Sequence, residues 1–228
     1  MPTSLNRATD AAAVHMWRQR IEAALAPDVP VADDLPASDA RRARHATRPA
    51  AVLIGIEATA TPRILFTERS HALRHHPGQI SFPGGRLDAG DAGPADAALR
   101  ECHEEIGLAR TAVELMGRLP TYRTVTGFEI SPFVGWVEPG QPLEPDGVEV
   151  ARIFRVPMAY AMDATHYRSE VLQRNGIDYR IYSIDFEGDH IWGATAAMLM
   201  GLAQRVAAVE GQPFAVPATA APTRHALD

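Results

Sequence analysis

Lysine is absent from this sequence, and all 22 basic residues are arginine. This absence excludes Schiff-base chemistry on a lysine and the lysine-bearing phosphate loop of many nucleotidases. A single cysteine, Cys102, excludes an intramolecular disulfide framework and a zinc site built from several thiolates. No apolar stretch approaches the roughly 20 residues of a membrane span. Charged residues also interrupt the N-terminal segment, where a secretory signal needs a continuous apolar run. We therefore expect a cytoplasmic protein with no membrane partner.

Charge and length restrict the partners and the domain organisation. The formal net charge of −6 argues against nucleic acid as a partner bound through a broad basic surface. Arginines gathered in one place can still bind phosphate groups. The 228 residues suit one core with added elements at its ends. We predict a helical extension and linker over residues 1–48, a main domain over 49–210 and a flexible, Pro- and Ala-rich tail over 211–228.

Hydrophobic patterning predicts a mixed α and β fold. We expect helices over 11–26, 94–106 and 192–209, and a short helix near 38–45 within the linker. Short apolar runs with Gly or Pro at their margins predict strands over 50–56, 63–69, 79–82, 115–120, 130–137, 151–156 and 178–186. The first two strands flank a Pro-containing turn, which is the pattern of a β-hairpin.

The helix over 94–106 combines an apolar face with an acidic face. Its apolar side carries Ala95, Ala98, Leu99, Cys102 and Ile106, and its other side carries Glu101, Glu104 and Glu105. Carboxylates at these spacings repel one another, and a divalent cation relieves that repulsion. Carboxylate oxygens are the ligands that Mg²⁺ and Mn²⁺ prefer.

A solvated acidic face is the simpler interpretation of three such glutamates. The preceding loop favours a metal site over a solvated face. Gly84 and Gly85 let the backbone approach a ligand closely, and Asp88 and Asp91 add acidic groups. A glycine-rich loop entering an acidic helix indicates phosphate and metal chemistry.

This segment resembles a known family motif. Residues 84–108 read GGRLDAGDAGPADAALRECHEEIGL, and residues 100–108 match the Nudix box pattern R-E-apolar-x-E-E-x-G-apolar at every fixed position. The resemblance implies an α/β (α+β) Nudix fold, in which a mixed β-sheet is sandwiched between α-helices, here with an added N-terminal helix and an added C-terminal helix. It implies Glu101 and Glu105 as the principal ligands of Mg²⁺ or Mn²⁺ and Glu104 as a further ligand or a base-supporting carboxylate. Arg100 is expected to orient the glutamates by ion pairing.

The loop departs from the general box and resembles one branch of the family. It is one residue longer, and Ala92 stands where the general box has a glutamate. A similar longer loop is typical of the coenzyme A pyrophosphatase branch, which also carries an upstream L-R-x-H-x-G-Q-apolar-x-F-P-G-G motif. The matching residues are Leu73, Arg74, His76, Gly78, Gln79, Ile80, Phe82 and Pro83.

From this resemblance we expect cleavage of coenzyme A or acyl-CoA into (acyl-)4′-phosphopantetheine and adenosine 3′,5′-bisphosphate. The expected substrate-binding residues are Arg69, Arg74, His76, Gln79, Gly84 and Gly85. The alternative for the two arginines is surface ion pairing. Two alternatives for the function stay open: hydrolysis of ADP-ribose, NADH or another nucleoside diphosphate derivative, and a non-catalytic Nudix module that senses a nucleotide.

Three further features complete the prediction. Residues 191–196, IWGATA, also resemble the coenzyme A pyrophosphatase branch, but apolar residues at helical spacing downstream favour a core role for that helix. Glu149 is a candidate for an additional metal ligand or base, as a late glutamate is in some Nudix enzymes. Cys102 lies on the apolar face, so we expect a core thiol and not a nucleophile. The sequence leaves open whether the protein forms a homodimer.

Overall fold

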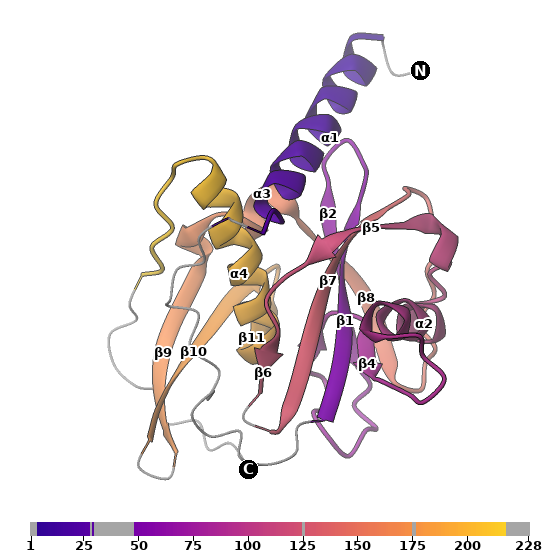
Figure 1. Ribbon diagram of the computed structural model, residues 1–228, viewed down its shortest axis with the longest axis vertical. Coiled ribbons are helices and arrows are strands. Elements are labelled where there is room, and N and C mark those ends of the chain that lie inside the picture. Colours follow the sequence, from indigo (N-terminus) through magenta and orange to yellow (C-terminus); the bar gives the residue numbers. More distant parts are fainter. Residues whose placement is uncertain (1–3, 28, 30–47, 125, 175–176, 218–228) are drawn as a thin grey trace.

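The computed structural model describes residues 4–27, 29, 48–124, 126–174 and 177–217 (Figure 1). Its centre is a mixed eight-stranded sheet, in which β1 runs parallel to β7 and antiparallel to β2 and β4. β8 pairs with β2, and β5 pairs with β7. The strands of this sheet are β1 (Arg48–Glu57), β2 (Arg63–Arg69), β3 (Ile80–Ser81), β4 (Gly84–Arg86), β5 (Val113–Arg118), β6 (Tyr122–Arg123), β7 (Phe128–Val137) and β8 (Val150–Pro157).

A second, antiparallel sheet of three strands follows in the chain, in the order β11-β10-β9. Its strands are β9 (Tyr167–Arg174), β10 (Ile177–Phe186) and β11 (Asp189–Trp192). The helices are α1 (Ser4–Ala24), α2 (Pro94–Ile106), α3 (Met158–Ala161) and α4 (Gly193–Val209), with 3₁₀ turns η1 (Arg110–Ala112) and η2 (Ala164–His166).

The two faces of the mixed sheet are covered by different helices (Figure 1). α2 packs on β1, β4 and β7, and its apolar side joins Leu53 and Leu65 of the sheet in one core cluster. On the other face, α4 lies between the mixed sheet and the three-stranded sheet, and α1 packs against α4. The predicted sandwich of a mixed sheet between helices is therefore confirmed.

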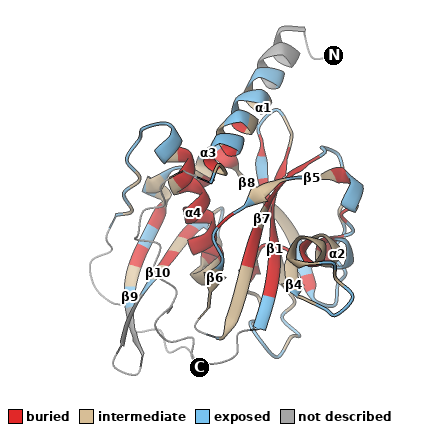
Figure 2. Cartoon of the chain, viewed as in Figure 1, coloured by how far each residue is buried: buried red, intermediate tan, exposed pale blue. Residues whose placement is uncertain are grey.

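The burial of α4 confirms the core role expected for it (Figure 2). Every residue from Thr195 to Ala203 is buried, as befits a helix that is apolar around most of its circumference. Thr195 Oγ1 donates a hydrogen bond of 3.1 Å to Ile80 O. The IWGATA segment therefore supports the strand that carries the upstream motif. Among the described residues, no helix is both long and apolar enough to cross a membrane.

Several elements differ from the predicted boundaries. α1 begins at Ser4, ahead of the predicted start at residue 11. β4, β6, β9 and β11 were not predicted, because the first two have only two or three residues and β9 is largely polar. Phe214 and Val216, assigned from sequence to a flexible tail, pack against the core. The short helix expected near 38–45 and tail residues 218–228 lie outside the described residues.

Candidate active site

The helix α2 forms where its sequence predicts, but its buried side differs in part from the predicted apolar side, because Ala95 and Leu99 are only half-buried and Glu105 is buried. Pro94 occupies its first turn, and Gly107 closes it with a left-handed φ of 69°, a backbone conformation that glycine adopts without a steric penalty. Its buried residues are Ala97, Ala98, Cys102, Glu105 and Ile106. Cys102 is 1% exposed and burial raises its thiol pKa, so the expectation of a core cysteine is confirmed.

The three glutamates of the acidic face lie in three different environments. Glu105 is buried, and its Oε2 accepts a hydrogen bond of 3.0 Å from Gly84 N. Glu101 is half-buried, and Glu104 is exposed. A uniformly solvated acidic face, the simpler interpretation of the sequence, is therefore wrong for Glu101 and Glu105.

The paired glycines let the loop backbone pass directly over these carboxylates. A Cβ atom on Gly85 would lie 2.4 Å from Glu101 Cδ, closer than real Cβ contacts allow. Gly84 has a φ of 147°, and a Cβ atom there would lie 2.3 Å from Ala51 O. Gly84 therefore requires glycine, whereas a side chain at Gly85 would displace the Glu101 carboxylate. β4 places the two glycines on β1 opposite Ala51 and Val52.

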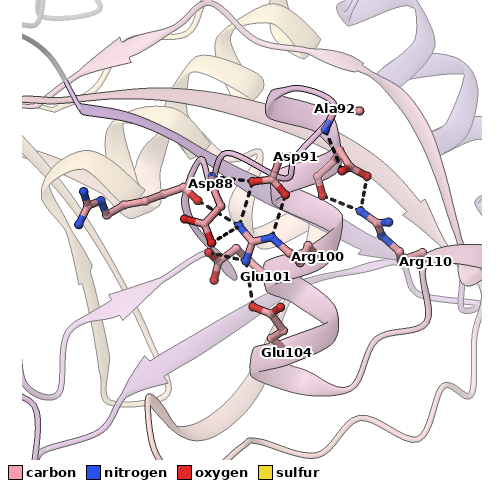
Figure 3. A network of polar contacts seen from close by, with 9 residues as sticks. Asp88, Asp91, Ala92, Arg100, Glu101, Glu104 and Arg110 are labelled. Atoms are coloured by element: carbon pink, nitrogen blue, oxygen red, sulfur yellow. Dashed lines mark hydrogen bonds and ion pairs between the residues drawn. The ribbon is translucent and has the colours of Figure 1, made fainter.

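Arg100 joins the loop to the acidic face (Figure 3). Its Nη1 donates to Glu101 Oε1 at 3.1 Å and to Glu104 Oε2 at 2.9 Å. Its Nε and Nη2 bind the two oxygens of Asp91 at 2.8 and 3.0 Å. These hydrogen bonds from Arg100 hold the pKa of Asp91 at about 2. The predicted orienting role of Arg100 thus has a geometric basis, whereas the sequence identified Asp91 only as an extra acidic group.

Burial and mutual repulsion make the free carboxylates of Glu101 and Glu105 unfavourable. Burial, together with the charges of Glu101 and Glu149, raises the pKa of Glu105 to about 8. Burial also raises the pKa of Glu101, against the opposing effect of its hydrogen bond from Arg100. Glu149 contributes to the shift at both sites, so its charge lies near both. A nearby cation would favour the ionised form of all these groups.

Arg69 is the predicted substrate-binding residue that the fold brings to this cluster. It is the last residue of β2, follows a register shift after Glu68 and pairs with Val150. Its charge acts to lower the pKa of Glu105. Within the described part of the chain, its buried Nε has no hydrogen-bond partner. A buried donor without a partner beside carboxylates leaves one site for an external acceptor.

The loop that follows β2 holds the remaining predicted substrate-binding residues. Gln79 is half-buried and closes the loop, because its carbonyl oxygen accepts a hydrogen bond of 3.0 Å from Arg69 N. Arg74 and His76 are exposed, and His76 has a left-handed φ of 55°. The fold therefore gathers Arg69, Gly84 and Gly85 at the carboxylates and leaves Arg74 and His76 on the surface of the loop.

The donor set fits a divalent metal ion. Glu101 is half-buried and Glu105 is buried, both supply carboxylate oxygens, and burial raises the pKa of each. The part of the chain that the structure describes contains no ready-formed group of three His, Cys, Asp or Glu side chains at ligating positions. Arg100 contributes to the separation of the possible ligands, since it binds the carboxylates of Glu101 and Glu104.

Comparison with known proteins identifies the family of this chain. The family model of the NUDIX domain matches residues 46–172. The Uncharacterized Nudix hydrolase NudL of Enterobacter sp. (strain 638) is 38% identical over 159 residues, which cover 70% of this chain and 83% of the relative. NudL of Escherichia coli (strain K12) is 39% identical over 159 residues, with the same two coverages of 70% and 83%.

A solved structure matches part of the chain as well. The Nudix hydrolase RenU of M. smegmatis is 20% identical, with a TM-score of 0.41 over 48% of this chain and 70% of that protein. The family model spans more than half of the chain, and the NudL relatives share well over 30% identity across most of their length. This chain therefore belongs to the Nudix hydrolase family and is a hydrolase.

Proposed function

We propose that this Nudix hydrolase cleaves the diphosphate bond of coenzyme A or acyl-CoA, yielding 4′-phosphopantetheine or its acylated form and adenosine 3′,5′-bisphosphate. The observation that carries the proposal is that the Gly84–Gly85 backbone passes over the carboxylates of Glu101 and Glu105, with Arg69 close enough for its charge to act on the pKa of Glu105. The match of residues 73–85 to the upstream motif of the coenzyme A pyrophosphatase branch supports this substrate over other diphosphates.

Nudix hydrolases generally use divalent metal ions, and we propose Mg²⁺ or Mn²⁺ here. Such an ion, when bound, lowers the pKa of water and neutralises charge on phosphoryl oxygens. Glu101 and Glu105 are the proposed principal ligands, because they are the two carboxylates withdrawn from solvent. Glu104, exposed and bound to Arg100, is proposed as a further ligand or a base-supporting group.

The residues around the carboxylates are proposed to bind and orient the substrate. The free Nε of Arg69 donates to a phosphoryl oxygen, an interaction that an arginine makes strongly because both partners are charged. Arg74 and His76 extend from the exposed loop toward the more distant groups of the substrate, and Gln79 fixes the base of that loop. Glu149 is proposed as an additional ligand or as the base that accepts the proton of water.

Product analysis tests the substrate. Purified protein is incubated separately with coenzyme A, ADP-ribose and NADH, each with Mg²⁺, with Mn²⁺ and with a chelator. We expect metal-dependent release of adenosine 3′,5′-bisphosphate from coenzyme A, faster than turnover of the other two. Preference for ADP-ribose or NADH would overturn the coenzyme A assignment and retain diphosphate hydrolysis. No turnover of any substrate would overturn the enzymatic proposal in favour of a nucleotide-sensing module.

A matched pair of variants tests the role of Arg69. Arg63 begins the same strand, is exposed and lies at the opposite end of β2. We expect R69A to lower kcat/KM by roughly 10- to 100-fold, the scale of losing a hydrogen bond to a charged group. R63A removes the same charge from the same strand and should leave kcat/KM unchanged. Equal effects of the two substitutions would show that only net charge matters.

A further inference from the structure

The loop between β7 and β8 is attached to the C-terminal end of the acidic helix. Glu144 N donates to Ile106 O at 3.1 Å, and Asp146 N donates to Glu105 O at 2.9 Å. The final carbonyls of a helix have no partner within the helix, so these bonds satisfy groups that would otherwise be free. The loop is thereby anchored at the residue whose side chain forms the centre of the carboxylate cluster.

The carboxylate of Asp146 organises the rest of this loop. Its Oδ1 accepts hydrogen bonds from the backbone N–H groups of Val148 at 3.2 Å, Glu149 at 3.1 Å and Val150 at 2.8 Å. Its Oδ2 also accepts from Glu149 N at 3.1 Å. Aspartate side chains commonly form such turns with the backbone that follows them. Gly147 has a left-handed φ of 72°, which permits the tight reversal.

Apolar packing holds this turn only at its last residue, since Val150 is 1% exposed and lies in a core cluster with Ile106 and Leu108. Val148 is 70% exposed, and Asp146 and Glu149 are exposed as well. The backbone position of Glu149 depends on the hydrogen bonds to Asp146, on two backbone hydrogen bonds, from Ser70 N to Glu149 O at 2.8 Å and from Gly147 N to Val150 O at 3.1 Å, and on the buried Val150. The turn lies beside the carboxylate cluster, because Asp146 N donates to Glu105 O and Val150 pairs with Arg69. In agreement with this position, the charge of Glu149 raises the pKa of both Glu101 and Glu105.

We propose that Asp146 is a positioning residue that holds Glu149 beside Glu101 and Glu105. The inference rests on the proposed metal-dependent hydrolysis, in which Glu149 serves as an additional ligand or base. Asp146 contacts neither the substrate nor the metal ion and acts only through the turn. Its loss frees the exposed residues 147–149, whose remaining anchors are backbone hydrogen bonds and the buried Val150, so Glu149 spends less time at the cluster.

Four variants and one control test this role. D146A removes the side-chain acceptor of the turn, whereas D146N retains a carbonyl oxygen that can accept from the same backbone groups. E149Q removes the charge that is being positioned, and D146A/E149Q combines the two changes. D163A is the matched control, because Asp163 Oδ1 accepts from Thr165 N at 2.8 Å and from Thr165 Oγ1 at 2.7 Å at the start of η2.

The first readout is Mn²⁺ binding by calorimetric titration, and the second is turnover of coenzyme A. Loss of a group that orients a metal ligand typically lowers affinity or activity 10- to 100-fold. We therefore expect D146A and E149Q each to weaken Mn²⁺ binding by roughly 10-fold or more. The double variant should bind no more weakly than E149Q alone, because Asp146 acts through Glu149. D146N should restore most of the affinity, and D163A should match wild type.

Three results would overturn the proposal: wild-type Mn²⁺ affinity in D146A, wild-type affinity in E149Q, or effects of D146A and E149Q that multiply in the double variant. Failure of the hydrolase proposal is recognised separately. If wild type binds Mn²⁺ and turns over no diphosphate substrate, the enzymatic proposal fails, while the Mn²⁺ affinities of the variants still decide the role of Asp146.

Discussion

Replacement of Glu105 by glutamine is expected to stabilise the metal-free protein while it abolishes activity. Glu105 is 7% exposed, and burial is the main cause that raises its pKa from 4.5 to about 8. Below pH 4.5 the carboxyl is protonated in the folded and unfolded chain alike, so the full free energy of unfolding is present there. Between pH 4.5 and about 8 the unfolded chain releases this proton and the folded chain retains it. The free energy of unfolding therefore falls as the pH rises through this window.

The size of the effect follows from the same pKa difference. One pKa unit corresponds to about 1.4 kcal/mol, so ionised Glu105 without a cation costs the fold about 3 to 5 kcal/mol. Glutamine is neutral, and its carbonyl oxygen can accept the hydrogen bond from Gly84 N. In a chain of this size about 1 kcal/mol changes Tm by roughly 2 to 4 °C. We expect E105Q to unfold about 6 to 20 °C above wild type near pH 8 in a chelator, and at the same temperature as wild type near pH 4.5.

Scanning calorimetry across this pH range in a chelator measures the stability, and product release with Mn²⁺ measures activity. Turnover in E105Q should fall by about 10²- to 10³-fold, the scale of losing one group that stabilises charge in a transition state. E104Q is the control. Because Glu104 is exposed, the Tm of this variant should stay close to that of wild type at every pH. Parallel pH profiles for wild type and E105Q, or an equal gain in E104Q, would refute the reasoning.

Two further substitutions test the packing around the site and the attachment of α1. G85A places a Cβ atom 2.4 Å from Glu101 Cδ and forces that carboxylate to move; hydrolysis should fall about 10²-fold, and Tm should change little. R205M removes the buried guanidinium whose Nε and Nη2 donate to Ala24 O at 2.7 Å and Ala26 O at 2.9 Å. Loss of these bonds at the end of α1 should lower the free energy of unfolding by about 2 to 4 kcal/mol and leave kcat unchanged.

Each of these substitutions has its own control in the chain. Gly90 lies in the loop that follows β4, with nothing within 4 Å of an added Cβ atom, so G90A should retain full activity. If G90A and G85A lose activity equally, loop flexibility and not the position of Glu101 is responsible. R205K retains the charge without the planar fork of donors and should recover only part of the stability. A Tm of R205M equal to wild type would show that these bonds do not hold α1 in place.

The burial of Glu105 also explains why the site cannot be optimised for stability alone. A buried carboxylate near other acidic groups is costly until a cation binds. The same burial withdraws the ligand from water, which strengthens its interaction with a bound ion. Burial of Glu105 therefore lowers the stability of the metal-free fold and raises the affinity for metal. We expect Mn²⁺ to raise the Tm of wild type but not that of E105Q.

The local sequence was sufficient to predict the helix that carries the carboxylates. Pro94 and Gly107 determine the ends of α2, and the spacing of its apolar residues determines which side faces the sheet. The Nudix box and the upstream motif are contiguous in the chain, so the sequence also predicted the family. It did not predict that Arg74 and His76, expected at the site, lie exposed on the loop. Long apolar strands such as β1 and β7 were predictable for the same reason, because their burial is recorded in a continuous run of side chains.

Only the tertiary structure distinguished the three glutamates from one another. They are equivalent in a helical pattern, and their differences arise from β4, which passes over Glu101 and Glu105 and leaves Glu104 in solvent. Two further contacts likewise depend on the fold. The hydrogen bond from Arg100 to Asp91 joins residues 9 positions apart, and the bond from Asp146 N to Glu105 O joins residues 41 positions apart. Sequence periodicity reports which face of an element is buried, but it does not report which distant backbone covers that face. Burial by that backbone, and with it the chemistry of each carboxylate, was decided by the fold.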